Sequence, residues 1–438
     1  MQWISQLIFA IFLAVGIEFF RRSVLKIKRN INIGCDEKIN DQSKERWKQT
    51  FLVALGQSKM VRRPVAGFFH ILIYAGFVLI NIEVLEILID GLLGTHRVFA
   101  EPLGGLYNTA IGFFEILAFG VLLACVVFLA RRYITKVPRF TMREMKGWPT
   151  KDATIILVVE IVLMGALLLM NASEQVLQHR GAMASHGSFP ISSYLTPLFS
   201  GYSTFTLHVL ERGFWWFHFV GILIFLNYLP FSKHWHIIMA FPNVYFSSLD
   251  PKGKFNNMDS VTTEVKLMMD PAAPTPEGYE PPAGFGAKDV NDLSWKNLMD
   301  AYTCTECGRC SSVCPANITG KLLSPRKVMM DTRDRVEEVG KAMDASGNKE
   351  MPQDGKDLHS YISAEELWAC TTCNACTDAC PVNINPVDII VQMRQYQVME
   401  KSAAPSELNG MFTNMENNGA PWQFNQNDKG QWAQGDAS

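Results

Sequence analysis

The chain has 438 residues, enough for two or three domains, and its formal net charge of −2 favours neither an acidic nor a basic partner. It shows no stripe of basic and aromatic residues, so we expect no nucleic-acid partner. Hydropathy divides the chain near residue 240. The first part is strongly apolar, and the second is polar and rich in Pro, Asp and Asn.

The apolar part contains five stretches long enough to cross the hydrocarbon core of a bilayer. They cover approximately residues 3–20, 65–89, 106–130, 154–170 and 214–229. We therefore predict an all-α transmembrane domain over residues 1–240, built as a five-helix bundle.

Positive charge is distributed unequally between the loops that join these stretches. Segments 21–64 and 131–151 carry twelve and seven Lys and Arg residues, whereas 90–105 and 171–210 carry one each. Because Lys and Arg accumulate on the cytoplasmic side of membranes, the N-terminus is predicted to lie outside and the polar part in the cytoplasm. The first residues lack a basic region before the apolar run, which favours an anchor over a cleaved signal peptide. The expected location is the cytoplasmic membrane.

Three histidines in or beside the spans are candidate ligands, because ionisable groups in membrane spans are usually functional. His70 begins the second span, His218 lies in the fifth, and His236 follows it. In one continuous helix, the 18 residues from His218 to His236 make five turns, so both share a face about 27 Å apart, although Pro230 can kink it. Imidazole is a standard axial ligand, which predicts haem b. The alternative is that these histidines only pack and hydrogen-bond.

Depth in the membrane suggests how these histidines pair. His70 and His236 both fall near the cytoplasmic side, so we predict that they hold one haem b together. His218 lies closer to the outer surface and is a candidate ligand of a second haem, whose other ligand would be His179, His96 or His208. Four glutamates within or beside the spans are candidates for quinone protonation or for interhelical hydrogen bonding: Glu83, Glu86, Glu115 and Glu160.

After the last span, residues 241–295 are predicted to form a Pro-rich connector. Five prolines between residues 271 and 282 oppose regular helix. A small helical domain is predicted over 296–400, with helices near 324–339, 364–368 and 386–399 and a surface loop over 344–356. The polar tail, 401–438, has a composition that favours disorder. Its aromatic residues favour docking on a partner instead: Trp422, Phe424 and Trp432.

Two cysteine runs in the small domain share the spacing C-x2-C-x2-C-x3-C-P. This is the spacing of bacterial ferredoxins, in which the fourth cysteine ligates the other cluster. It predicts a ferredoxin-like double 4Fe-4S domain. The first cluster would be held by Cys304, Cys307, Cys310 and Cys380, and the second by Cys370, Cys373, Cys376 and Cys314. Zinc is the alternative, but zinc sites usually use paired CxxC units. Thiolates kept as cluster ligands indicate a reducing compartment, the cytoplasm.

The membrane part resembles the nitrate-reductase gamma-type cytochrome b. The motifs that carry the resemblance lie at residues 63–70 (RPVAGFFH), 216–218 (WFH) and 229–236 (LPFSKHWH). The polar part resembles the cluster-binding portion of the large heterodisulfide reductase subunit, at 285–287 (FGA), 305–310 (TECGRC) and 322–326 (LLSPR). The chain departs from both patterns. Ile80 stands where the gamma-type cytochrome carries a further haem ligand, and no adjacent Cys-Cys pair or later cysteine follows Cys380.

The resemblance implies a membrane-anchored electron-transfer subunit of a quinone-linked oxidoreductase. Electrons would pass between a catalytic partner, two 4Fe-4S clusters, haem b and the quinone pool. The expected partner is a cytoplasmic, cysteine-rich, heterodisulfide-reductase-like subunit on another chain. One alternative is a subunit of an electron-transferring-flavoprotein:quinone oxidoreductase. The alternative from another class is a zinc-binding membrane scaffold without redox activity.

Overall fold

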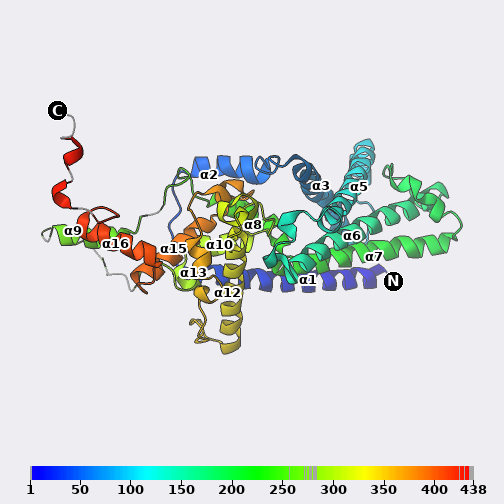
Figure 1. The fold of residues 1–438 in the computed structure, drawn as a ribbon. Helices are drawn as coiled ribbons and strands as arrows, with labels where there is room; N and C mark the ends of the chain where they lie inside the picture. The colour runs from blue at the N-terminus through cyan, green and yellow to red at the C-terminus, as the bar shows by residue number, and fades with distance from the viewer. Residues whose placement is uncertain are drawn as a thin grey trace.

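The computed structural model describes residues 2–433 except 256, 271, 273, 276–278, 280–283, 424 and 429. Over these residues the protein is all-α, as predicted, and the one β-bridge that occurs pairs Cys35 with Ser294. Five long apolar helices form a bundle at one end of the molecule (Figure 1). They are α1 (Gln2–Ile31), α3 (Pro64–Leu93), α5 (Gly105–Tyr133), α6 (Trp148–His179) and α7 (Thr204–Tyr228).

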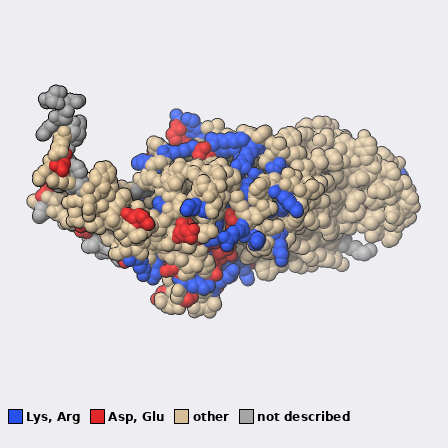
Figure 2. All heavy atoms as spheres, in the orientation of Figure 1, with Lys and Arg blue, Asp and Glu red and all other residues tan. Residues whose placement is uncertain are grey.

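These five helices are long and apolar enough to cross a membrane, which confirms the predicted spans and indicates a membrane protein. Within the bundle, α6 packs against α5 and α7, and α1 packs against α3 and α7. Their outward faces remain apolar, with exposed side chains such as Phe68, Phe113 and Val158. Figure 2 shows Lys and Arg gathered over the middle of the molecule and almost absent from the bundle end. An uncharged surface of this kind suits contact with lipid.

Helix α1 is longer than its apolar stretch. Hydropathy falls at residue 20, but residues 21–31 contain neither Gly nor Pro, so the helix continues to Ile31. This extension runs along the second part of the molecule and contacts α10 (Trp295–Thr303) and α12 (Pro325–Ser346). Asn30 donates to the Tyr302 hydroxyl over 2.9 Å, and Arg29 donates to the carbonyl of Gly340 over 2.9 Å. A Cβ at Gly340 would lie 2.3 Å from Asn30 Oδ1, so the two helices approach closely.

The second part of the molecule is a set of shorter helices around two loops that carry the cysteines. The predicted helices 364–368 and 386–399 coincide with α13 (Ala364–Trp368) and α15 (Pro386–Met399). Both start on clear local signals, a Ser363 cap and Pro386 at the first position. The remaining α-helices are α2 (Ser43–Gln49), α4 (Ala100–Leu103), α8 (His236–Tyr245), α9 (Asp259–Met269), α11 (Pro315–Ile318), α14 (Ala375–Ala379) and α16 (Ser406–Asn418).

The predicted connector and tail are partly helical. The connector contains α9, which ends before the proline-rich segment; within that segment Pro271, Pro276, Pro281 and Pro282 lie outside the described residues. The tail contains α16, and Trp422 after it is exposed. Phe424 and the side chain of Trp432, the other two aromatic residues of the docking prediction, lie outside the described parts.

Candidate redox sites

Both cysteine runs fold into loops with the same backbone pattern. The second and fourth residues after the first cysteine are left-handed in each run: Glu306 and Gly308 in the first, Thr372 and Asn374 in the second. Left-handed backbone at alternate positions curls the chain around one centre, and Gly and Asn tolerate it best. A side chain is also excluded at Gly308, because a Cβ there would lie 2.3 Å from Arg326 Nη1. The two loops are therefore structural repeats.

The eight thiols of these loops gather in two groups of four. In the first group, Cys310 is half-buried, and its pKa is raised well above the usual value by desolvation of the thiol and by the nearby thiols of Cys307, Cys304, Cys380 and Cys376. Burial together with Cys307 and Cys304 raises the pKa of Cys380 to about 12. The four cysteines of this group line one cavity, and Cys376 of the second run lines it too. Cys380 comes from the second run, so this group crosses between the two runs.

The second group contains the fourth cysteine of the first run. Burial raises the pKa of Cys370, and the thiols of Cys314 and Cys373 lie close enough to add to the effect. Burial also raises the pKa of Cys376 to about 12, with Cys370 and Cys314 as its thiol neighbours. The structure thus places each fourth cysteine, Cys314 and Cys380, with the first three of the other run. This is the arrangement that the predicted ligand sets require, with four sulfur donors for each cubane.

Backbone groups also point at two of these sulfurs. The N–H of Thr372 donates to Cys370 Sγ over 3.4 Å, and that of Ile384 donates to Cys380 Sγ over 3.3 Å. Hydrogen bonds to ligand sulfur stabilise the more negative, reduced state and so raise a cluster's reduction potential. Both groups therefore contain sulfur atoms that accept hydrogen bonds from the backbone, which can tune the potential of a bound cluster.

Three imidazoles meet at the base of the bundle. The ring centroids of His70 and His236 lie 6.4 Å apart, and those of His234 and His236 lie 5.8 Å apart. His236 Nδ1 donates to the carbonyl of Lys233 over 2.9 Å, which leaves Nε2 free as a ligand atom. The buried Nδ1 atoms of His70 and His234 find no hydrogen-bond partner within the described chain.

The distance between the ring centroids of His70 and His236 matches that of two imidazoles bound to one metal ion. With metal–nitrogen bonds of about 2.0–2.1 Å, two imidazoles on opposite sides of an ion have centroids about 6 Å apart. The observed 6.4 Å agrees with this value. The buried, unpartnered nitrogen of His70 fits the same interpretation, since burial without a partner is costly. These residues fit a haem.

His218 does not share a helix face with His236, contrary to the sequence argument. Helix α7 ends at Tyr228, and two 3-10 turns, Leu229–Phe231 and Lys233–Trp235, separate it from α8, which starts at His236. Pro230 lies in the first turn and interrupts the five-turn register. His218 remains inside α7, with 2% of its surface exposed, and its Nδ1 donates to the carbonyl of Leu163 over 3.0 Å.

His234 is the residue that sequence reasoning missed. A continuous helix would have turned it away from the other histidines, whereas the tight turn Lys233–Trp235 brings it beside His236. Pro230 was the available signal, because a break there changes the direction of every later side chain.

The loop of the first cysteine run packs directly on the bundle. Glu306, between two cysteines, forms an ion pair with Lys233 in the histidine segment. Arg309 donates to the carbonyls of Lys59 and Met60 over 3.0 and 3.3 Å, just before α3 begins. Lys59 in turn donates to the carbonyl of Cys380 over 3.3 Å. The first thiol group is therefore held against the segments that carry His70 and His236.

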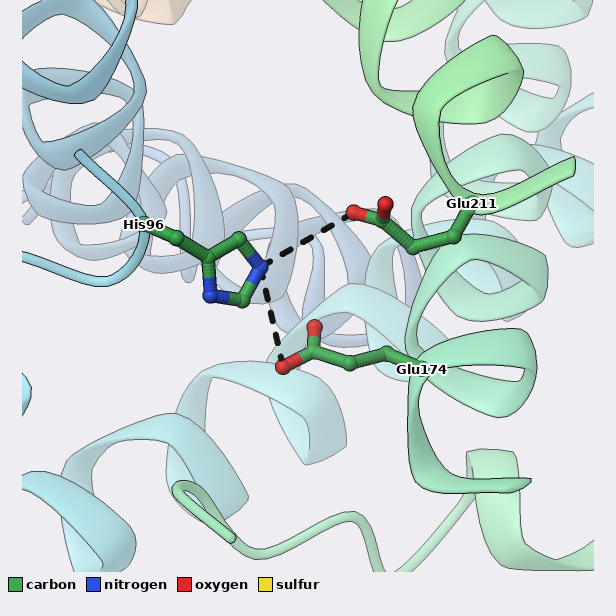
Figure 3. Close-up of side chains that lie close together, drawn as sticks. All are labelled: His96, Glu174 and Glu211. Atoms are coloured by element: carbon green, nitrogen blue, oxygen red, sulfur yellow. Dashed lines mark ion pairs between the residues drawn. The ribbon is translucent and has the colours of Figure 1, made fainter. Parts of the chain in front are cut away.

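A second polar cluster lies at the opposite end of α6 and α7. Figure 3 shows His96 facing Glu174 and Glu211, with His96 Nε2 3.9 Å from an oxygen of each. Arg97 also donates to Glu174 through Nε and through Nη2, each over 2.7 Å. His96, a candidate second haem ligand, thus sits among carboxylates. Of the glutamates named above, Glu86 bonds Tyr107 and Glu115 bonds Ser192, which favours interhelical hydrogen bonding for both.

Comparison with known proteins identifies the domain that carries the cysteines. Residues 303–384 match the 4Fe-4S dicluster domain. The second part of the chain therefore contains an iron–sulfur dicluster domain, and the zinc alternative loses its support. No solved structure matches the chain significantly.

Two relatives match most of the chain. It is 29% identical to the "Probable iron-sulfur-binding oxidoreductase FadF" of Bacillus subtilis, over 98% of this chain and 60% of the relative. It is 28% identical to the "EtfAB:quinone oxidoreductase" of Syntrophomonas wolfei, over 87% of this chain and 53% of the relative. The chain thus spans less than two thirds of the length of these relatives. A component of the dihydromethanophenazine:CoB–CoM heterodisulfide reductase of Methanosarcina acetivorans is 28% identical over 28% of this chain and 30% of the relative.

These likenesses support an oxidoreductase with an electron-transfer role. The dicluster match supplies the cofactor class, and the five apolar helices supply the membrane anchor. A "Probable membrane-anchored ferredoxin" of Chromohalobacter salexigens, 31% identical over 34% of this chain and 24% of the relative, combines the same two properties in its name.

Proposed function

We propose that the protein relays electrons between a cytoplasmic partner and membrane quinone through two 4Fe-4S clusters and one haem b. The observation that carries this proposal is the stacking of the first thiol group on the segments that hold His70 and His236. Redox centres held against each other on either side of a membrane surface suit transfer into the bilayer. The cluster domain lies on the cytoplasmic side in this proposal, in line with the charge of the loops.

The ligand roles follow from the grouping of the side chains. The first cluster is assigned to Cys304, Cys307, Cys310 and Cys380, and the second to Cys370, Cys373, Cys376 and Cys314. His70 and His236 are assigned to haem b, with His234 beside them. A haem with two imidazole ligands supplies one-electron transfer, because it keeps no open position for substrate. His218, with a free Nε2, remains a candidate for a second haem.

An electron-transferring flavoprotein is the proposed partner. The relative whose name states this activity matches 87% of the chain, whereas the heterodisulfide reductase component matches 28%. This extent of similarity favours the flavoprotein over the heterodisulfide-reductase-like partner that the motifs suggested. The second candidate function is the same electron relay with a heterodisulfide-reductase-like protein as the partner.

The test starts with purified protein in lipid nanodiscs. We expect iron and acid-labile sulfide for two cubanes and a reduced-minus-oxidised haem b spectrum. His70→Ala and His236→Ala should each remove the haem signal that the two residues share and leave cluster iron unchanged. His186→Ala, a histidine between the fourth and fifth spans, is the matched control and should change neither. Wild-type protein without haem would contradict the haem assignment.

Partner identity is tested in the same preparation. Reduced EtfAB, added in stoichiometric amount, should reduce the clusters at a rate that saturates with EtfAB concentration. A reduced heterodisulfide-reductase-like protein is the competing donor. If EtfAB leaves the clusters oxidised while dithionite reduces them, the flavoprotein proposal is wrong and the relay itself stands.

A further inference from the structure

A cavity lies where the bundle meets the cluster domain. It is walled by the first turns of α6, the 3-10 turns after α7, and helices α10 and α12. Its enclosed volume is about 90 Å³ and it opens to the outside, so it admits the leading edge of a ring rather than a whole drug-sized molecule. Its position is the level at which apolar helix ends give way to charged side chains.

The mouth of this cavity is aromatic and apolar. Trp148 and Phe231 line it and are 53% and 66% exposed, beside Pro230. Both aromatic residues stand at the ends of spans, where side chains meet the boundary between lipid and water. These two aromatic residues therefore place one side of the cavity at the predicted membrane boundary.

The inner wall offers a hydrogen-bond donor that the protein does not use. Trp235 lines the cavity with 3% of its surface exposed, and its Nε1 has no hydrogen-bond partner in the part of the chain that the structure describes. A buried indole N–H usually finds a partner, since a buried donor left unpaired destabilises the protein. An acceptor on a bound molecule would satisfy it.

The same wall borders both proposed redox sites. Glu306 lines this cavity and also the cavity of the first thiol group, because it stands between Cys304 and Cys307. Trp235 directly precedes His236. A molecule in the cavity therefore lies against residues that border both proposed redox sites.

We propose that this cavity binds the head group of a quinone, with Trp235 Nε1 donating to one quinone carbonyl. This inference rests on the proposed relay and names where the relay meets its substrate. In the reduction, two electrons supplied through the relay and two protons from the cytoplasmic side convert both C=O groups into C–O–H groups. The ring becomes aromatic, and hydroquinone leaves through the same mouth. The reverse reaction uses the same atoms.

Carboxyl groups beside the cavity can carry the protons. Asp334 and Glu337 of α12 line the cavity, and burial raises the pKa of each carboxyl above its usual value. Carboxyls that hold protons nearer to neutral pH exchange them more readily with a substrate at neutral pH. Lys233 and Arg333, which also line the cavity, both pair with Glu306.

The experiment follows reoxidation of dithionite-reduced protein in nanodiscs by decyl-ubiquinone and by 2-methyl-1,4-naphthoquinone. Trp235→Phe keeps the ring and removes the N–H, so the half-saturating quinone concentration should rise about two- to tenfold, the effect of one hydrogen bond. The maximal rate and the haem and iron contents should stay near those of wild type. Trp422→Phe, an exposed tryptophan of the tail, is the matched control and should change nothing.

Photolabelling with an azidoquinone gives a second result that does not depend on folding of a variant. Label should appear in the peptides around Trp148 and Trp235 and should decrease when decyl-ubiquinone is added in excess. Label confined to other spans, or an unchanged half-saturating concentration in Trp235→Phe, would overturn the site and leave the relay intact. Wild-type protein whose clusters no quinone reoxidises would instead contradict the proposed function.

Discussion

Cys314 and Cys380 each end one cysteine run, yet each lies among the thiols of the other run. The exchange ties the two loops together, so neither site can form from one loop alone. Raised thiol pKa values follow from burial in both groups, and cluster assembly must therefore release protons from these cysteines. Folding of the two loops and cluster assembly are thus expected to be coupled.

Serine substitutions can show whether each fourth cysteine ligates the cluster of the other run (crossed ligation) or the cluster of its own run. Cys380→Ser should weaken the same cluster as Cys307→Ser, because both thiols belong to the first group. We expect each variant to lose about half of the iron, and the two to retain the same electron paramagnetic resonance signal after reduction.

Cys314→Ser and Cys373→Ser form the matched pair for the second cluster and should retain the complementary signal. Crossed ligation is wrong if the spectrum of Cys380→Ser instead resembles that of Cys373→Ser.

At this scale the spacing predicted which thiols lie together, because cubane geometry requires a fixed order of sulfurs; that they ligate two clusters stays a prediction. The sequence also predicted that His70 and His236 come together, from their depth in the bundle. It missed His234 and the ion pair of Lys233 with Glu306. Both depend on a turn at Pro230 and on packing between distant segments, which local periodicity does not describe.

At the scale of elements, the loop between α5 and α6 is fastened to the first turn of α12. Glu144 accepts from Arg326 over 2.7 Å and from the Ser324 hydroxyl over 2.6 Å, and Arg326 is fully buried. Burial alone would raise the pKa of Glu144, but Arg326 and these hydrogen bonds outweigh it, so the pKa lies below its usual value. The ionised carboxylate is therefore the form that joins bundle and cluster domain.

The lowered pKa of Glu144 determines how the stability of the protein depends on pH. Because the pKa of Glu144 is lower in the folded protein, Glu144 stabilises the junction fully when the pH is above its ordinary pKa. This stabilisation is lost as the pH falls through the pKa of the folded state. Glu144→Gln should lower the free energy of unfolding by about 3 kcal/mol at neutral pH, since it leaves Arg326 buried without its charge partner. Its stability should also fall less steeply in acid, measured by thermal unfolding across pH.

Asp250→Asn is the control, because Asp250 pairs with Lys254 on the surface and such pairs contribute little. Equal destabilisation in both variants would mean that Glu144 has no special role at the junction.

Helix boundaries were predictable where the sequence carries a local signal. Ser363 and Pro386 mark the starts of α13 and α15. By contrast, α1 was expected to stop near residue 20, since hydropathy measures contact with lipid and not helicity. Its last turns are held by contacts with α12, which lies some 300 residues later in the chain.

At the scale of the whole molecule, the surface drawn in Figure 2 carries almost no charge at the bundle end and many Lys and Arg residues in the middle. The cationic belt lies where the bundle meets the cluster domain, as expected for the cytoplasmic side of a membrane. In the proposed orientation, the loops between α3 and α5, and between α6 and α7, lie on the outer side.

Orientation can be measured with single cysteines at exposed sites. Ser193→Cys, between α6 and α7, should react with a membrane-impermeant maleimide in intact cells. Asn348→Cys, in the loop after α12, should react only after the cells are opened. Labelling is compared with the parent protein, in which Cys35 is exposed. The opposite pattern would invert the proposed topology.

Helix α1 has a further consequence because it is one uninterrupted element. Its 30 residues extend about 45 Å, longer than the hydrocarbon core of about 30 Å, and the remainder lies along α10 and α12. Helix α1 is therefore a rigid connection between the bundle and the cluster domain. A flexible linker would instead let the cluster domain move between its electron donor and acceptor. Electron transfer from the clusters into the bundle should then be insensitive to solvent viscosity, and only the encounter with the soluble partner should slow when glycerol is added.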